Sequence, residues 1–97
     1  MGRTLIERRL RDTSDRLKIV RAEIGVAEEQ LAHFADEADE ARLRALVSET
    51  PLAEQDHREA SRHAEAMRRH RDGLVAEAAQ LEAAQDDLLD RLVAASA

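Results

Sequence analysis

Histidines are the residues of this 97-residue chain that first suggest metal chemistry. His63 and His70 are seven residues apart on one helical edge, about 10 Å along the helix axis, which is too far for one ion. The geometry permits a His–Glu–His arrangement, because His33 and Glu37 are four residues apart and His63 is expected opposite Glu37. We expect an ordinary His33–Glu37 charge pair, with no metal site and no cofactor.

Carboxylates gather in two acidic runs, at positions 36–40 and 86–90. General acid–base catalysis would require a concave, partly dry pocket that shifts their pKa values. A solvated helix face offers no such pocket. The sequence also contains no nucleophile–base arrangement and no glycine-rich phosphate loop. We therefore expect no catalytic residues and no enzyme.

Two basic runs, Arg8–Arg11 and Arg68–Arg71, raise the question of nucleic-acid binding. Acidic residues are interspersed among the bases, the net charge is −6, and the chain has no Trp or Tyr for base stacking. The first run is expected beside the acidic stretch 82–90, which would neutralise it. We therefore expect no nucleic-acid partner.

No apolar run approaches the roughly 20 residues that span a bilayer, and the Arg-rich beginning lacks a signal-peptide core. No helix face joins a Lys/Arg border to bulky apolar residues either, as surface-bound helices do. The absence of Cys is compatible with a reducing compartment. We expect a cytoplasmic protein with no membrane partner.

The elements that position these residues are expected to be helices, because the chain is rich in Ala, Leu, Glu and Arg. The single proline, Pro51, follows Thr50, a favourable N-cap, and fits the first turn of a helix. The sequence therefore predicts an all-α protein with one domain, 1–97. It contains a helix over about 4–47, a turn at 48–50 and a helix over about 51–95.

Heptad repeats run through both expected helices. In the first helix the expected core positions are Ile6, Leu10, Thr13, Leu17, Val20, Ile24, Ala27, Leu31, Phe34, Ala38, Ala41 and Ala45. In the second helix they are Ala53, His57, Ala60, Ala64, Met67, Arg71, Leu74, Ala78, Leu81, Gln85, Leu88 and Leu92. Residue n of the first set faces residue 98 − n of the second, which centres the turn on Glu49. The pattern predicts a long antiparallel two-helix hairpin, a coiled coil.

This register also predicts which charged residues flank the seam between the helices. The expected opposite-charge pairs are Arg42 with Glu54, Glu28 with Arg68, and Arg44 with Asp56. Two expected pairs are like-charged, Glu23 with Glu77 and Arg9 with Arg91.

Apolar residues near the chain ends exceed what one seam needs. The expected oligomer interface consists of Leu5, Ile19, Val26, Val75, Leu89 and Val93. Such surplus surface is usually covered by another helix, so we expect a homodimer with a two-fold axis, forming a four-helix bundle. Two alternatives stay open: single apolar residues on a solvated surface, or coverage by a different protein.

The exposed turn is the natural recognition element for a protein partner. Its candidate residues are Ser48, Glu49, Thr50, Glu54 and Asp56. With Glu49, Glu54 and Asp56 at its tip, the hairpin resembles in shape the helical-hairpin factors that insert an acidic coiled-coil tip into the secondary channel of bacterial RNA polymerase. The resemblance lies in the architecture and in no motif.

The sequence thus favours a small non-catalytic coiled-coil interaction or scaffold protein that self-associates and binds a protein partner. The alternative is a transcription- or nucleoid-associated factor. Such a factor would contact nucleic acid or RNA polymerase through the Arg runs or the acidic tip.

Overall fold

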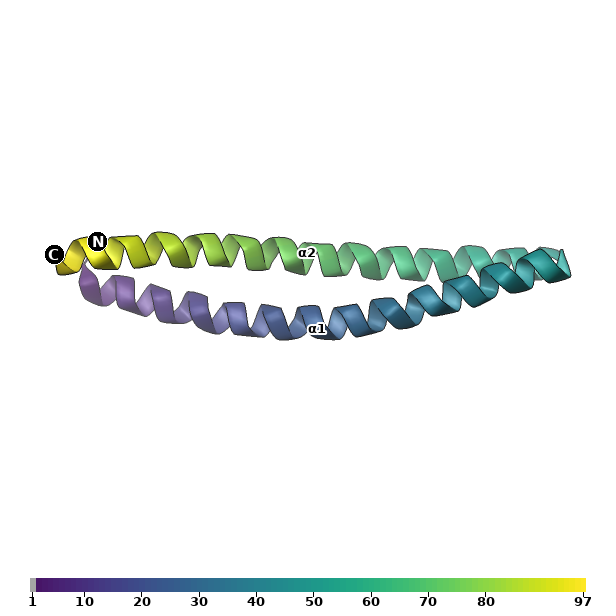
Figure 1. The fold of residues 1–97 in the computed structure, drawn as a ribbon, viewed down its shortest axis with the longest axis horizontal. Helices are drawn as coiled ribbons and strands as arrows, with labels where there is room; N and C mark the ends of the chain where they lie inside the picture. The colour runs from purple at the N-terminus through teal and green to yellow at the C-terminus, as the bar shows by residue number, and fades with distance from the viewer. Residues whose placement is uncertain (1) are drawn as a thin grey trace. The chain divides into compact units, whose positions relative to one another are not determined.

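The computed structural model describes residues 2–97 and contains two long helices. Helix α1 comprises Arg3–Ser48 and helix α2 comprises Pro51–Ser96. The two helices form a hairpin, in which α1 begins beside the end of α2 (Figure 1). The predicted all-α two-helix hairpin is confirmed. Neither helix contains a stretch long and apolar enough to cross a membrane within the described residues.

The turn between the helices consists of Glu49 and Thr50. The Thr50 side-chain oxygen accepts a hydrogen bond from the backbone N–H of Ala53 (3.2 Å), as expected of an N-cap. The backbone N–H of Glu49 donates to the carbonyl of Ala45 (3.1 Å), and Glu49 has a φ of 52°. This left-handed residue, which follows the last helical residue Ser48, ends α1. The turn is therefore one residue shorter than the predicted 48–50.

The hairpin divides into two compact units, and the size of the buried side chains differs between them. One unit joins the residues up to Ile24 with those from Leu74 onward, and the other spans Gly25–Gly73. The buried residues of the first unit, here called the terminal unit, are Ile6, Leu17, Val20, Leu74, Ala78 and Leu88. Those of the second, the turn unit, are all alanines: Ala27, Ala41, Ala45 and Ala64. Because alanine buries little area, the large apolar contribution lies in the terminal unit.

Every predicted heptad core position is buried or half-buried. Outside that set, the residues of the described chain that are not exposed are Glu7, Ser14, Ala35 and Glu77. The polar core residue Gln85 donates its side-chain amide to the Ser14 hydroxyl (2.9 Å). Within residues 2–97, no buried side-chain nitrogen or oxygen lacks a hydrogen-bond partner. The predicted seam is confirmed.

Ion pairs between the helices occur in the terminal unit, but not between the expected partners. Glu77, expected opposite the like-charged Glu23, accepts hydrogen bonds from Arg16 Nε (2.9 Å) and Nη2 (3.2 Å). Arg21 Nη2 donates to Glu82 Oε1 (3.1 Å). In both pairs the two residues are offset along the helix axis from the expected register. The long arginine side chain spans this offset.

In the turn unit, arginines bond to acids of their own helix rather than to the predicted partners across the seam. Arg42, expected to pair with Glu54, donates to Asp39 three residues earlier on α1. Arg68, expected to pair with Glu28, donates to Glu65 (2.6 Å) three residues earlier on α2. Partners three or four residues away on a helix are always within reach.

Candidate functional site

Two of the four histidines, His33 and His63, lie next to the single phenylalanine, Phe34. His33 Nε2 lies 3.1 Å from Glu37 Oε1, so the expected charge pair is present, with both side chains exposed. The ring centroids of His33 and His63 lie 5.7 Å and 6.1 Å from that of Phe34. Across residues 2–97, no three His, Asp or Glu side chains are grouped so that they could hold a metal ion.

A hollow beside Ala38 and Ala64 brings together a serine, a histidine and an aspartate, which spacing along one helix did not indicate. Its polar lining consists of Asp39, Arg42, His57, Ser61, Glu65 and Arg68. The Asp39 carboxylate is occupied by two hydrogen bonds from Arg42, at 3.3 Å and 3.1 Å. Among the described residues, the side chains of His57 and Ser61 form no hydrogen bond with each other. The hollow therefore lacks the nucleophile–base contact that activates a serine.

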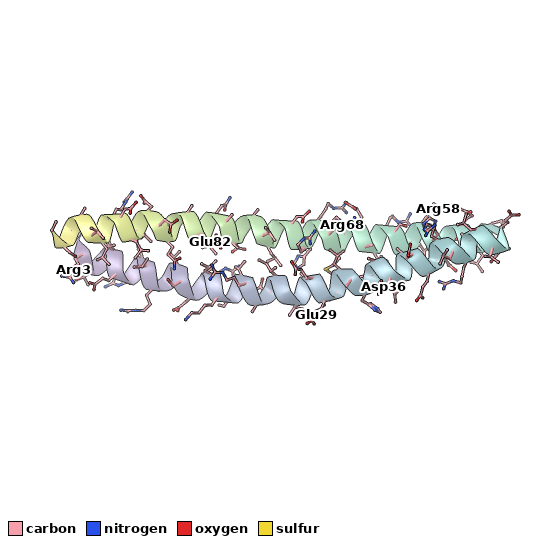
Figure 2. The ribbon with its side chains drawn as sticks, in the orientation of Figure 1. Arg3, Glu29, Asp36, Arg58, Arg68 and Glu82 are labelled. Carbon is pink, nitrogen blue, oxygen red and sulfur yellow. The ribbon has the colours of Figure 1, made fainter. Side chains whose placement is uncertain are left out.

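The acidic runs lie on solvated helix surface. Glu29 and Asp36 are on the side of α1 that is turned away from α2 (Figure 2). All the acidic residues of the two runs are exposed. Asp39 and Asp87 line surface hollows but remain exposed, whereas general acid–base catalysis requires a drier, enclosed site.

The two basic runs differ in how they are neutralised. In the second run, Arg68 and Arg69 both lie within salt-bridge distance of Glu65, and Arg71 pairs with Asp72 at 2.7 Å. In the first run, none of the arginines forms an ion pair with any residue in the described part of the chain. Arg9 lines a hollow that it shares with Asp87 and Arg91, and Asp87 pairs there with Arg91 (3.0 Å). The expected neutralisation within the fold thus holds for the second run and leaves the first run unpaired.

The predicted oligomer-interface residues are all exposed: Leu5, Ile19, Val26, Val75, Leu89 and Val93. The two cross-helix ion pairs show which faces they occupy. Arg16 and Arg21 flank the seam and are five residues apart, about 140° around α1. Consequently the Arg16–Glu77 pair marks one face of the hairpin and the Arg21–Glu82 pair marks the opposite face.

The predicted interface residues of the two helices fall on these two different faces. Ile19 follows Arg16 by one helical turn, and Leu5 and Val26 lie at multiples of seven residues from Ile19. These three apolar residues, here called the α1 stripe, share the face of the Arg16–Glu77 pair.

The apolar residues of α2 lie on the other face. Val75 and Leu89 are seven residues before and after Glu82, and Val93 follows Leu89 by one turn. These three, here called the α2 stripe, share the face of the Arg21–Glu82 pair. The structure therefore does not bring the predicted interface residues together into one patch.

At the turn, two of the predicted partner-binding residues are engaged in ending and starting the helices. The Ser48 hydroxyl donates to the carbonyl of Arg44 (2.7 Å), and the Thr50 side-chain oxygen caps α2. Glu49, Glu54 and Asp56 are exposed, so their carboxylates are free to meet a partner.

Three large apolar side chains next to the turn were missed by the sequence reasoning. Leu46, Val47 and Leu52 are 63%, 86% and 67% exposed. The signal that could have found them is their position, since none belongs to the heptad core and all lie within four residues of the turn. The residues next to the turn thus expose both apolar side chains and the acidic side chains of Glu49, Glu54 and Asp56.

No protein family, curated protein or solved structure matches this chain.

Proposed function

We propose that the protein is a small non-catalytic coiled-coil interaction or scaffold protein of the cytoplasm, which forms homodimers and binds a protein partner at its turn. The terminal unit supplies the self-association contact, and the tip supplies the partner contact. No cofactor, membrane or nucleic acid takes part in this function.

The observation that carries the proposal is the amount of apolar surface left exposed outside a filled seam. Ile19 and Val75 remain 52% and 45% exposed, although they lie in the unit whose seam already buries large residues. Burying the rest of such a side chain contributes about 1 kcal/mol. Covering a stripe of three residues therefore favours association, and a neighbouring hairpin offers a helix of suitable length.

The tip supports a different kind of contact. Leu46, Val47 and Leu52 expose apolar surface within four residues of the turn, and neither Glu49 nor Glu54 forms an ion pair among the described residues. A complementary surface would be an apolar spot bordered by lysines or arginines. The alternative, an acidic tip that enters a channel of RNA polymerase, uses the same residues and is one outcome of the partner test below.

Sedimentation equilibrium tests self-association. The wild-type protein should show twice the monomer mass of 10.9 kDa in the micromolar range. A double variant, Ile19→Glu with Val75→Glu, should be monomeric and still helical by circular dichroism at low temperature. Leu43→Glu is the matched control, because Leu43 is as exposed as Ile19 (52%) but lies in the turn unit. A wild-type mass of one monomer throughout this range would overturn the proposal.

Capture from a lysate of the source cells tests the partner contact. A protein retained by the wild type should be lost with Val47→Asp and Leu52→Asp and kept by Leu43→Glu. If the retained material is RNA polymerase, the alternative function holds. Direct duplex DNA binding that weakens steeply with salt would instead show a nucleic-acid function.

A further inference from the structure

We propose that the α2 stripe binds a second copy of this protein in parallel orientation, so that α1 of each copy lies on α2 of the other. This inference rests on the proposed self-association and specifies its face and its direction. It follows from how charge is distributed around the α2 stripe.

The α1 side of this face is basic. Lys18 precedes Arg21 by one turn, and Arg11 precedes Lys18 by seven residues, so these three lie along one edge of α1. All three are exposed, and within residues 2–97 neither Arg11 nor Lys18 forms an ion pair. Two acids border this edge: Glu7 pairs with Arg3 (3.0 Å), and Asp15 lies one turn from both Arg11 and Lys18, so bases still outnumber acids along the edge.

The α2 side of the same face is acidic. Glu82 lies midway between Val75 and Leu89, and Asp86 follows Glu82 by one turn. Both acids are exposed, and Asp86 forms no ion pair among the described residues. Figure 2 shows Glu82 on α2. The α2 stripe is thus accompanied by acids on its own helix and by bases on the neighbouring one.

The opposite face lacks this separation. Beside the α1 stripe, Arg9 and Asp12 alternate in sign along α1, and Asp87 and Arg91 alternate along α2. Asp87 and Arg91 pair with each other (3.0 Å), whereas Arg9 and Asp12 form no ion pair among the described residues, so each helix presents both signs of charge on this face. The face of the α2 stripe therefore differs from the opposite face in that its bases lie on α1 and its acids on α2.

Symmetry determines which orientation uses these charges. A two-fold axis parallel to the helices places α1 of each copy over α2 of the other, so the basic edge meets the acidic edge twice. A two-fold axis perpendicular to the helices places α1 over α1, so bases meet bases, which is unfavourable. In the parallel arrangement Arg11 lies at the level of Asp86 of the second copy, since residue n faces residue 98 − n along the seam.

This dimer leaves the α1 stripe uncovered on its outer surface. Leu5, Ile19 and Val26 are then present twice, on opposite sides of the four-helix assembly. Self-association through the α2 stripe is therefore independent of them.

The first measurement identifies the face. Val75→Glu alone should dissociate the dimer, whereas Ile19→Glu, on the other face and similarly exposed, should leave the wild-type mass unchanged in sedimentation equilibrium. The reverse pattern would overturn this inference while leaving the proposed self-association intact. A monomeric wild type would overturn both.

The second measurement tests the direction by charge exchange. The acid-substituted variant carries Arg11→Glu, and the base-substituted variant carries Asp86→Lys at the position expected opposite residue 11 of the second copy. Each variant alone should dimerise about tenfold more weakly than the wild type. An equal mixture of the two variants should form heterodimers in native mass spectrometry with affinity restored to the wild-type level, because both contacts are again of opposite charge. Circular dichroism checks that each variant remains helical.

The opposite orientation gives a different result with the same variants. If α1 packs on α1, like charges face each other in the wild-type homodimer and in the homodimer of each variant, so neither variant alone dimerises more weakly than the wild type, and the acid-substituted variant pairs preferentially with the wild type. Preferential pairing of the acid-substituted variant with the wild type, or no preference among the three proteins, would overturn the parallel arrangement.

Discussion

Truncation of Leu17 is the sharpest test of the seam. Leu17 is 2% exposed and lies in the terminal unit, where the large buried side chains gather. Leu→Ala removes about three methylene equivalents, which at about 0.8 kcal/mol each is about 2.4 kcal/mol of lost burial. The cavity adds to this cost, but two helices can close part of it by small shifts. We expect Leu17→Ala to lower the free energy of unfolding by about 2–3 kcal/mol.

The matched control is Leu43→Ala. Leu43 is 52% exposed, so Leu43→Ala loses roughly half of the burial free energy that Leu17→Ala loses. The higher helix propensity of alanine offsets part of this loss. The expected loss is below about 1 kcal/mol. Leu81→Ala, in the same predicted layer as Leu17 and half-buried, should fall between the two.

Urea unfolding followed by circular dichroism, at one fixed protein concentration, measures all three. Equal losses at Leu17, Leu81 and Leu43 would show that burial along the seam does not determine the stability of the hairpin.

Three further predictions concern the backbone and the register. Gly25→Ala with Gly73→Ala should raise the free energy of unfolding by about 1 kcal/mol per site, because an added Cβ meets nothing within 4 Å at either helical position; an unchanged melting temperature would contradict this. Glu49→Gly should raise the free energy of unfolding by about 1 kcal/mol, because glycine adopts the left-handed conformation (φ 52°) without a steric penalty. Glu49→Ala should bring no such increase, because alanine has the same penalty as glutamate. Cysteines at Ile24 and Leu74, in a protein with none of its own, should form an intramolecular disulfide on oxidation. Its absence in monomeric material would contradict the register.

The hairpin and its core could be predicted from the sequence, because burial in a two-helix seam depends on little more than the heptad spacing of residues. Even the polar positions His57, Arg71 and Gln85 are half-buried as predicted. The start of α2 could also be predicted, because Thr50 caps the helix and Pro51 fits its first turn without any tertiary contact.

The ion pairs and the faces could not be predicted in the same way. Glu77 pairs with Arg16 rather than facing Glu23 unopposed, because the reach of a long side chain decides the partner and spacing alone does not give it. The assignment of Ile19 and Val75 to opposite faces also required the two cross-helix ion pairs. The exposed Val47 was missed because only the apolar residues near the chain ends, and not those next to the turn, were compared with what the seam needs.

The alanine core of the turn unit has a consequence for the order of folding. Ala45 and Ala53 are eight residues apart in the sequence, whereas Leu17 and Leu81 are 64 apart. Bringing Leu17 directly to Leu81 closes a longer loop than bringing Ala45 to Ala53, and it costs about 2 kcal/mol more in chain entropy. We therefore expect the helices to associate first next to the turn. Those first layers bury alanines, and the large side chains of the terminal unit are expected to form their contacts later. We therefore expect substitutions at Glu49 to change mainly the folding rate, and Leu17→Ala to change mainly the unfolding rate and so the lifetime of the folded hairpin.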